Sequence, residues 1–559
     1  MVPPLLSVSS RHPRRCATAA SLLVVLAGVV GLPSRGAEVL EIQLDSLRLP
    51  IPLAQLEAWS RQPASAGRRM AEPAALDGAS DLAAWFALLD GQSQRELRQL
   101  LRAPLLRDQS FGRQLLDSWA GSQLLAEVGG LLTTPDGRST TPLLQVTLRR
   151  LLEERREVSV VELLRALPTA RLQLQLDGLL SLAQQWRVQL KLQREALRQL
   201  ARMPALPTRT LSAPPPAAAA GSGPLRGPRR LSLLVPGRGE PLPLEIWTPQ
   251  PAAPFGPRRP WLLVMPGLGG TAEQLGWLAA ALAERGWPVV VLQHPGSDAA
   301  AVKATLNGLR PPPGAETLQP RLADLDAVLR AQSEGLLPLG AQTDGVVLIG
   351  HSLGGVAALL GSGLAPETGL ERRCKRSLDR LPITNPSLLL QCQLPAEALP
   401  VAARPPERLR GVVVFNSFGS LLWPQNGVRS LPVPVMMVGG SLDLVTPPLA
   451  EQLDLFLPVG DDRSRLVLVE GGSHFSPVRV SGREETLLRL GAELVGASPE
   501  VVQALLLRLT EEFLESVEPP PASGMAPQRL RLDGVSAHVM DGRAAAAWLE
   551  RLRAALAGG

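Results

Sequence analysis

The stretch VVLIGHSLGGVAALL, residues 346–360, decides the fold. Its leading apolar residues predict a buried strand, and the run from Val356 onward begins a helix. The glycines between them allow a turn in which a side chain would clash, so the hydroxyl of Ser352 is left exposed at the junction. A nucleophile elbow needs this strand–turn–helix setting, and the Leu353 N–H at the helix start can face a developing oxyanion. An ordinary glycine-rich turn is the alternative.

Short apolar runs alternate with helical segments on both sides of this elbow. Buried runs in that arrangement predict an α/β fold with a mostly parallel, doubly wound sheet. The predicted domain spans 231–559, with an insertion at 361–410 and a helical tail that includes 501–515. A hairpin is expected at 231–235 and 242–247, and helices are expected at 272–285 and 318–332. Further strands are predicted at 261–265, 289–292, 346–349, 412–415, 435–438 and 466–469.

A serine hydroxyl needs a base to take its proton, and the chain has five histidines. His474 follows the last predicted strand, where the chain order serine, acid, histidine places the base. His351 adjoins the serine but points elsewhere on such a turn, and His294 is interpreted as a loop residue near the pocket. Asp443, directly after the 435–438 strand, is the predicted acid that orients the base. A structural histidine and a loop-capping aspartate are the alternatives.

The glycine-rich segment MPGLGG, residues 265–270, follows the first central strand. Its backbone can supply a second oxyanion donor, for which the Leu268 N–H is the candidate. Gly267, His294, His351 and Phe418 are candidates for the substrate pocket. No phosphate-loop motif is present and no His, Cys and Asp residues are closely spaced, so neither a cofactor nor a metal is expected.

The first 36 residues are interpreted as an export signal. Arginines precede an apolar stretch at 16–32, and small residues at Ser34 and Gly36 suit cleavage. An uncleaved membrane anchor is the rival, because 17 residues is the lower limit for spanning. Of the three cysteines, Cys374 and Cys392 stay in the mature chain, and an oxidising compartment predicts a disulfide between them.

Residues 37–202 predict a helical N-terminal domain after a short extended start. Capping boxes are predicted at Ser93 with Glu96 and at Ser159 with Glu162. A third helix is predicted from Ser181 to about residue 202. A basic stripe on it predicts either contact with an anionic membrane surface or a solvated face. The stripe consists of Arg187, Lys191, Arg194, Arg198 and Arg202.

The segment 203–230, rich in Pro, Ala and Gly, predicts a linker.

Composition narrows the function classes. Apolar residues make up 45% of the 559, which is enough for a large core and excludes wholesale disorder. A net charge of +6 over this length is mild, so nucleic acid is not expected as a partner. The chain has no tyrosine, which excludes any mechanism that needs a phenolic acid.

Together these residues resemble the α/β-hydrolase superfamily. The resemblance covers about 230–515 and rests on the segments GLGG, GHSLGG and GSHF together with Asp443. More narrowly, the chain resembles bacterial α/β-hydrolases with an N-terminal helical domain of unknown function, through the segment EIQLDSLRLP at 41–50 and the loop HPGS at 294–297. A more distant similarity to platelet-activating-factor acetylhydrolases and dienelactone hydrolases implies ester hydrolysis. Dienelactone hydrolases use a cysteine nucleophile, whereas this chain has Ser352.

The sequence therefore predicts an exported serine hydrolase that cleaves carboxylic esters, with lipid or phospholipid acyl esters as the expected substrates. Ser352, His474 and Asp443 form the expected triad, and the Leu268 and Leu353 amides form the expected oxyanion hole. A hydrolase of small soluble esters or lactones is one alternative. A non-catalytic binding module on the same fold is another.

Overall fold

The structure is a computed structural model that describes most of the chain from residue 36 to residue 558. The predicted export segment, residues 1–36, lies outside the described residues except for Gly36. The described residues are 36–45, 47–61, 86, 90–106, 109–154, 158–203, 207–212, 227–249, 259–339, 343–379, 382–394, 405–479, 496–518 and 525–558.

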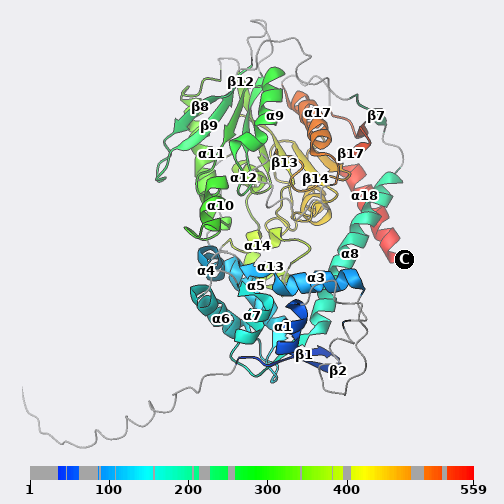
Figure 1. The fold of residues 1–559 in the computed structure, drawn as a ribbon. Coiled ribbons are helices and arrows are strands. Elements are labelled where there is room, and N and C mark those ends of the chain that lie inside the picture. The colour runs from blue at the N-terminus through cyan, green and yellow to red at the C-terminus, as the bar shows by residue number, and fades with distance from the viewer. Residues whose placement is uncertain are drawn as a thin grey trace, which may run out of the picture.

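The larger part of the molecule is built on an eleven-stranded sheet, in the order β7-β16-β17-β15-β14-β13-β12-β10-β11-β9-β8 (Figure 1). The six strands from β15 to β11 in that order are parallel, and antiparallel pairs extend the sheet on both sides of them. The parallel strands are β10 (Arg259–Met265), β11 (Val289–Leu292), β12 (Thr343–His351), β13 (Leu409–Phe415), β14 (Val435–Gly440) and β15 (Arg465–Val469). The outer strands are β7 (Thr208–Thr210), β8 (Arg229–Leu233), β9 (Leu242–Trp247), β16 (Gln528–Leu532) and β17 (Val535–Met540).

Helices cover both faces of this sheet, which is why its central strands are apolar on both sides. Side chains alternate between faces along a strand, so Trp261, Leu263 and Met265 of β10 join one core while Leu262 and Val264 join the other. The first face carries α11 (Leu318–Ser333), α12 (Leu353–Gly361), α18 (Gly542–Ala557) and the end of α8 (Leu176–Ala201). The second face carries α9 (Ala272–Glu284) and α17 (Pro499–Val517). Shorter helices are α10 (Ala299–Leu306), η2 (Ala315–Thr317), α13 (Leu370–Ser377), α14 (Ser387–Gln391), η3 (Leu449–Leu453) and α15 (Asp454–Phe456).

The predicted fold class is confirmed, and each strand predicted from 231 to 469 is present within a few residues of its predicted ends. The predicted helix at 501–515 is present as α17, but the tail is not helical throughout, because β16 and β17 form a hairpin that adds to the sheet after this helix. β16 has the sequence QRLRL, whose arginines give it a polar pattern, and the antiparallel register with β17 buries only its alternate leucines.

The N-terminal part is a mixed α/β unit rather than the helical domain that was predicted. It has a four-stranded sheet in the order β2-β1-β6-β4, and its short strands alternate polar and apolar residues, as in RLQLQ of β6. Ser159 and Glu162 form the predicted capping box, whereas Asp90, not Ser93, caps the helix that follows it. The strands are β1 (Val39–Leu44), β2 (Leu47–Pro52), β4 (Leu132–Thr133) and β6 (Arg171–Gln175), with a separate pair β3 (Pro104–Leu106) and β5 (Val158–Ser159). The helices are α1 (Leu53–Arg61), α3 (Gly91–Arg102), α4 (Gln109–Asp117), α5 (Trp119–Leu131), α6 (Thr141–Glu154) and α7 (Val160–Ala166).

Helix α8 connects the two parts (Figure 1). It begins at Leu176, five residues before the predicted start, and its far end packs against α18, where the Trp548 indole donates to the Ala196 carbonyl at 2.9 Å. Ala196 and Leu200 are buried in the core of the larger part. The predicted boundary at residue 202 therefore does not separate two independent cores. The predicted linker also contains a strand, because β7 pairs with β16.

The insertion at 361–410 contributes α13 and α14, which the predicted disulfide joins. Cys374 and Cys392 are bonded, with their Cα atoms 5.5 Å apart, so the predicted pairing is confirmed. None of the helices in the described part of the chain is long and apolar enough to cross a membrane.

Candidate active site

Ser352 occupies a strained turn between β12 and α12. Its backbone has φ 52° and ψ −122°, a conformation that costs a non-glycine residue about 1–3 kcal/mol. The neighbouring glycines are required by space, because a Cβ at Gly350 would lie 2.2 Å from the Gly354 carbonyl oxygen. A Cβ at Gly354 would lie 2.2 Å from the carbonyl oxygen of Met265. The turn is thus fixed by glycine on both sides of the serine, and the Ser352 N–H donates to the Phe415 carbonyl at 2.9 Å.

The structure brings the three predicted residues Ser352, His474 and Asp443 into one hydrogen-bonded chain. The Ser352 Oγ lies 3.1 Å from Nε2 of His474, and the His474 Nδ1 lies 2.9 Å from Oδ2 of Asp443. Each side chain follows the carboxyl end of a parallel strand, β12, β14 or β15. A histidine held in this way by a carboxylate carries its proton on Nδ1, which leaves Nε2 free to accept the hydroxyl proton.

Asp443 is fully buried and accepts hydrogen bonds from several donors. The Val445 and Thr446 N–H groups donate to Oδ1 at 2.8 and 2.7 Å. Oδ2 accepts from the Asn416 amide at 2.7 Å and from the Thr446 hydroxyl at 2.6 Å, besides His474. Burial alone would raise the pKa of this carboxyl group, but the charge and hydrogen bond of His474 and the bonds from Thr446 lower it below its usual value. The group is therefore an anion at neutral pH.

Asn416 and Thr446 are functional candidates that the sequence reasoning missed. Asn416 directly follows β13, the strand end where some hydrolases place the acid, and here it holds Asp443 and the Ser473 carbonyl instead. Its position after a buried strand was the available signal. Val445, two residues after the aspartate, has the spacing of an Asx turn, and Thr446 is the next residue, so such a turn was the available signal.

His351 points under the histidine loop rather than into the pocket. Its Nε2 donates to the carbonyl oxygen of His474 at 2.9 Å, and its ring lies 5.1 Å from the His474 ring. Burial, with the nearby His474, lowers the pKa of His351 to about 3, so the ring is neutral at neutral pH. His351 therefore positions the His474 backbone, and its assignment as a pocket residue is wrong.

The oxyanion loop at 266–268 lies against the serine. A Cβ at Gly267 would lie 3.1 Å from the Ser352 Cβ, so any larger residue there would push the loop or the serine aside by a few tenths of an ångström. Neither the Leu268 nor the Leu353 N–H donates to an acceptor among the described residues. Two unpaired N–H groups beside a serine can stabilise an oxyanion.

Arg321 of α11, which the sequence reasoning did not single out, anchors this loop from below. Its guanidinium donates to the carbonyl oxygens of Pro266 at 2.6 Å and Gly267 at 2.9 Å, and to the Ser297 hydroxyl at 3.0 Å. Only 1% of the residue is exposed. Burial, opposed by the charge of Asp324, lowers the pKa of Arg321 to about 9, so the group remains a cation at neutral pH.

His294 belongs to the same buried network and not to the pocket wall that was predicted. Its Nδ1 lies 2.8 Å from Oδ2 of Asp324, which also pairs with Arg238 and lies one helical turn from Arg321. Burial, assisted by the charge of Arg321, lowers the pKa of His294 to about 4. This histidine is a neutral structural residue beneath the oxyanion loop.

A cavity of about 820 Å³ opens at Ser352, within the range of small-molecule sites. Phe418 lines it as predicted, whereas Gly267, His294 and His351 do not. Leu268, the candidate oxyanion donor, also lines it. Most of its wall is apolar. The wall also includes Pro311, Pro312, Pro313, Pro386, Leu389, Leu390, Leu394 and Val445.

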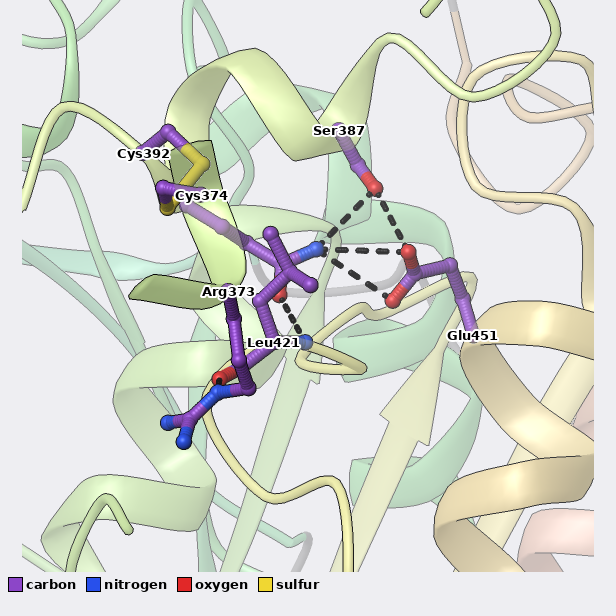
Figure 2. The surroundings of a disulfide bond; sticks show 7 residues. Arg373, Cys374, Ser387, Cys392, Leu421 and Glu451 are labelled. Carbon is purple, nitrogen blue, oxygen red and sulfur yellow. Dashed lines mark hydrogen bonds between the residues drawn. A yellow bond between two sulfur atoms is a disulfide. The ribbon is translucent and has the colours of Figure 1, made fainter. Parts of the chain in front are cut away.

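The disulfide and the buried carboxylate of Glu451 together hold α14, one side of this wall (Figure 2). Glu451 accepts from the Gln391 amide at 3.2 Å and from the Gly419 N–H at 2.9 Å, and the Ser387 hydroxyl lies 3.0 Å from it. The Gln391 amide oxygen in turn accepts from the Leu421 N–H at 2.7 Å. Both ends of α14 are therefore tied to η3, and its last residue is also tied to the loop that follows β13.

No group of three or more His, Cys, Asp or Glu side chains in the described residues is arranged to hold a metal ion.

The fold and site define the class of protein, and the matches of family models agree with it. Residues 261–485, which contain Ser352, Asp443, His474 and the oxyanion loop, match the model of the alpha/beta hydrolase family. Residues 36–175 match a model described as an alpha/beta hydrolase of unknown function. The chain belongs to the α/β-hydrolase superfamily, so the predicted resemblance to this superfamily is confirmed. Membership of this family suggests that the chain has hydrolase activity. No curated protein matches the chain.

Proposed function

We propose that this chain is an exported serine hydrolase that cleaves carboxylic esters. The Ser352 Oγ attacks the ester carbonyl carbon while Nε2 of His474 takes its proton, and Asp443 stabilises the imidazolium. The Leu268 and Leu353 N–H groups bind the oxyanion of the tetrahedral intermediate. Its collapse breaks the bond to the alkoxy oxygen, which leaves with the proton from His474. Water, deprotonated by the same histidine, then releases the acid from Ser352.

The observation that carries the proposal is the hydrogen-bonded chain from Ser352 to Asp443 at the floor of an apolar cavity. The strained serine turn supports it, since strain of this kind is held where a nucleophile must be presented. The buried anion at Asp443 supports it further, because the imidazolium needs a charge partner in a low-dielectric site. A loop-capping aspartate would not need His474 as a partner.

A series of p-nitrophenyl esters of increasing acyl length tests this proposal. The purified chain should hydrolyse at least part of the series, and a fluorophosphonate should label Ser352. Ser352→Ala and His474→Ala should each reduce kcat by several orders of magnitude, and the double variant should lose little more, because the residues act as a unit. Labelling of Ser352→Ala at the normal rate would rule out this nucleophile. Absence of labelling in the unaltered chain would favour a non-catalytic binding module.

Export is part of the proposal, and the disulfide supports it, because such bonds form and persist in oxidising compartments. The predicted signal segment at 1–36 supplies the route. Fractionation of cells that express the full chain should place the mature protein outside the cytoplasm, and its N-terminal sequence should begin near residue 37. A cytoplasmic protein with residue 1 intact would contradict this part.

Lipid esters are the proposed substrates, and the surface of α8 favours them over small soluble esters or lactones. All five residues of the basic stripe are exposed, and Leu180 and Val188 on the same helix are 53% and 59% exposed. Cations beside apolar side chains suit the surface of an anionic membrane. Binding to vesicles with anionic lipid should weaken as salt rises, and the variant with Arg187, Lys191 and Arg194 replaced by Gln should bind less. Preference for short soluble esters without vesicle binding would select the alternative.

A further inference from the structure

The active-site cavity has a wall that comes from a distant part of the chain. Residues 117–120, at the corner between α4 and α5, line the same cavity as Ser352. They belong to the N-terminal part, which lies directly below α10, α13 and α14 in Figure 1. Helix α4 contacts α10, and the Gln114 amide lies within hydrogen-bonding range of the Gly308 carbonyl at 3.4 Å. The corner is therefore docked on the larger part beside the site.

Hydrogen bonds and close packing fix the conformation of the α4–α5 corner. Ser118 caps α5 by accepting from the Gly121 N–H at 3.0 Å, and its hydroxyl donates to the Leu115 carbonyl at 2.7 Å. A Cβ at Gly121 would lie 1.8 Å from that same carbonyl oxygen, so glycine is needed for the close approach of the two helices. Trp119, the first residue of α5, is thereby fixed at the cavity wall with 36% of its surface exposed.

The charged residues that line the cavity are all acidic. Asp117 and Glu316 are its charged residues, and neither Lys nor Arg is among the residues that line the cavity. Arg149 pairs with Asp117 from outside the cavity, which offsets part of its charge. Glu316 is exposed and accepts only the Gly314 N–H among the described residues. An anionic group that entered this apolar space would meet like charge and would lose its hydration without gaining a cation.

We propose that the α4–α5 corner determines substrate specificity: Trp119 contacts the larger apolar group of the ester, and the wall rejects substrates with a negative charge there. The proposal rests on the function proposed above and deepens it, because it selects uncharged esters with a bulky apolar group. It also gives the N-terminal part a direct role in the reaction.

Two substrates of equal length test the charge selection. p-Nitrophenyl pentanoate and the mono-p-nitrophenyl ester of glutaric acid differ in a terminal carboxylate. The unaltered chain should hydrolyse the neutral ester with at least tenfold higher kcat/KM, and Glu316→Gln should narrow the difference. Higher salt should also narrow it, because screening weakens the repulsion. Equal kcat/KM for the two esters in the unaltered chain would overturn the charge selection without any variant.

Esters of different acyl length test the contact with Trp119. Trp119→Ala should lower kcat/KM about 10- to 100-fold for a bulky acyl ester, as loss of a buried aromatic contact does, and should change the acetate ester by less than about twofold. Trp119→Phe should retain most of the activity. Val146→Ala on α6, a residue 69% exposed and away from the cavity, is the matched control. An equal loss for all esters, or none, overturns the contact. Fluorophosphonate labelling of Ser352 in every variant separates this failure from failure of the proposed hydrolase function.

Discussion

Arg321→Met gives the sharpest test of how the oxyanion loop is held. The guanidinium of Arg321 touches no part of the cavity, but it donates to two successive carbonyl oxygens of the loop, at Pro266 and Gly267. Methionine fills similar space and donates nothing. The two carbonyls then lose their partners, and the loop shifts to find others, so the Leu268 N–H no longer points at the oxyanion.

The expected loss of kcat follows from the loss of one oxyanion donor, the Leu268 N–H. Removal of one oxyanion donor lowers kcat by about 10²- to 10³-fold, which corresponds to about 3–4 kcal/mol of transition-state stabilisation. The free energy of unfolding should fall by about 3 kcal/mol, because the buried carbonyl oxygens of Pro266 and Gly267 lose their donor, and each buried group left without a partner costs about 1–3 kcal/mol. KM should change little, since the residues that line the cavity remain.

Steady-state kinetics with a p-nitrophenyl ester, together with urea denaturation of the same samples, measure both losses. Arg321→Lys keeps the charge but cannot reach all the acceptors, so its kcat should lie between those of the Met variant and the unaltered chain. A folded Arg321→Met protein with kcat within threefold of the unaltered chain would refute the reasoning. A rise in KM with constant kcat would show that Arg321 shapes the cavity instead.

Three further predictions concern the site and its frame. Asp443→Asn should lower kcat by about 10³- to 10⁴-fold with an unchanged circular dichroism spectrum, because the amide cannot stabilise the imidazolium; activity within tenfold would contradict the role of the acid. Replacing both Cys374 and Cys392 by Ser should lower the free energy of unfolding measured in urea by about 3 kcal/mol, from the entropy of an 18-residue loop, and unchanged stability would mean that the bond does not form. The buried His294 and His351 have pKa values of about 4 and about 3, so between these pH values and about pH 6.5 they bind a proton only in the unfolded chain. The free energy of unfolding should therefore fall by about 1.4 kcal/mol per histidine for each pH unit below 6.5. A urea midpoint that stays constant from pH 6.5 to 4.5 would contradict this.

The fold could be predicted because the signals that specify it are local. The central strands are buried on both faces, so they appear as apolar runs, and glycines mark the turns where chains approach closely. The hairpin of β16 and β17 was missed because one strand carries arginine at alternate positions, and only its partner strand makes it part of the sheet. A strand that is buried only by a partner distant in sequence has no apolar pattern of its own from which it could be predicted.

The order of Ser352, Asp443 and His474 along the chain was enough to predict that they meet, since parallel strands bring their carboxyl ends to one edge. The supporting residues could not be found in that way. Arg321 lies in the first turn of α11, and because an arginine on a helix is ordinarily solvated, only the packing of this helix shows that the side chain lies under the loop. The same limit applies to Trp119, whose place at the cavity depends on how α4 and α5 dock, although both helices lie more than 220 residues before the serine in the sequence.

Backbone strain at Ser352 and Asn416 connects the fold to the chemistry. Four non-glycine residues in the described ranges have positive φ. Asp45 and Asp533 lie in tight hairpin turns, where aspartate tolerates that conformation. Ser352 and Asn416 instead end the adjacent strands β12 and β13, at about 1–3 kcal/mol each, and the sheet holds both: Ser352 N–H donates to Phe415, and Asn416 N–H donates to Val438. Because these ladder bonds fix the two strained ends side by side, the hydroxyl and the amide that holds Asp443 are set before any substrate arrives.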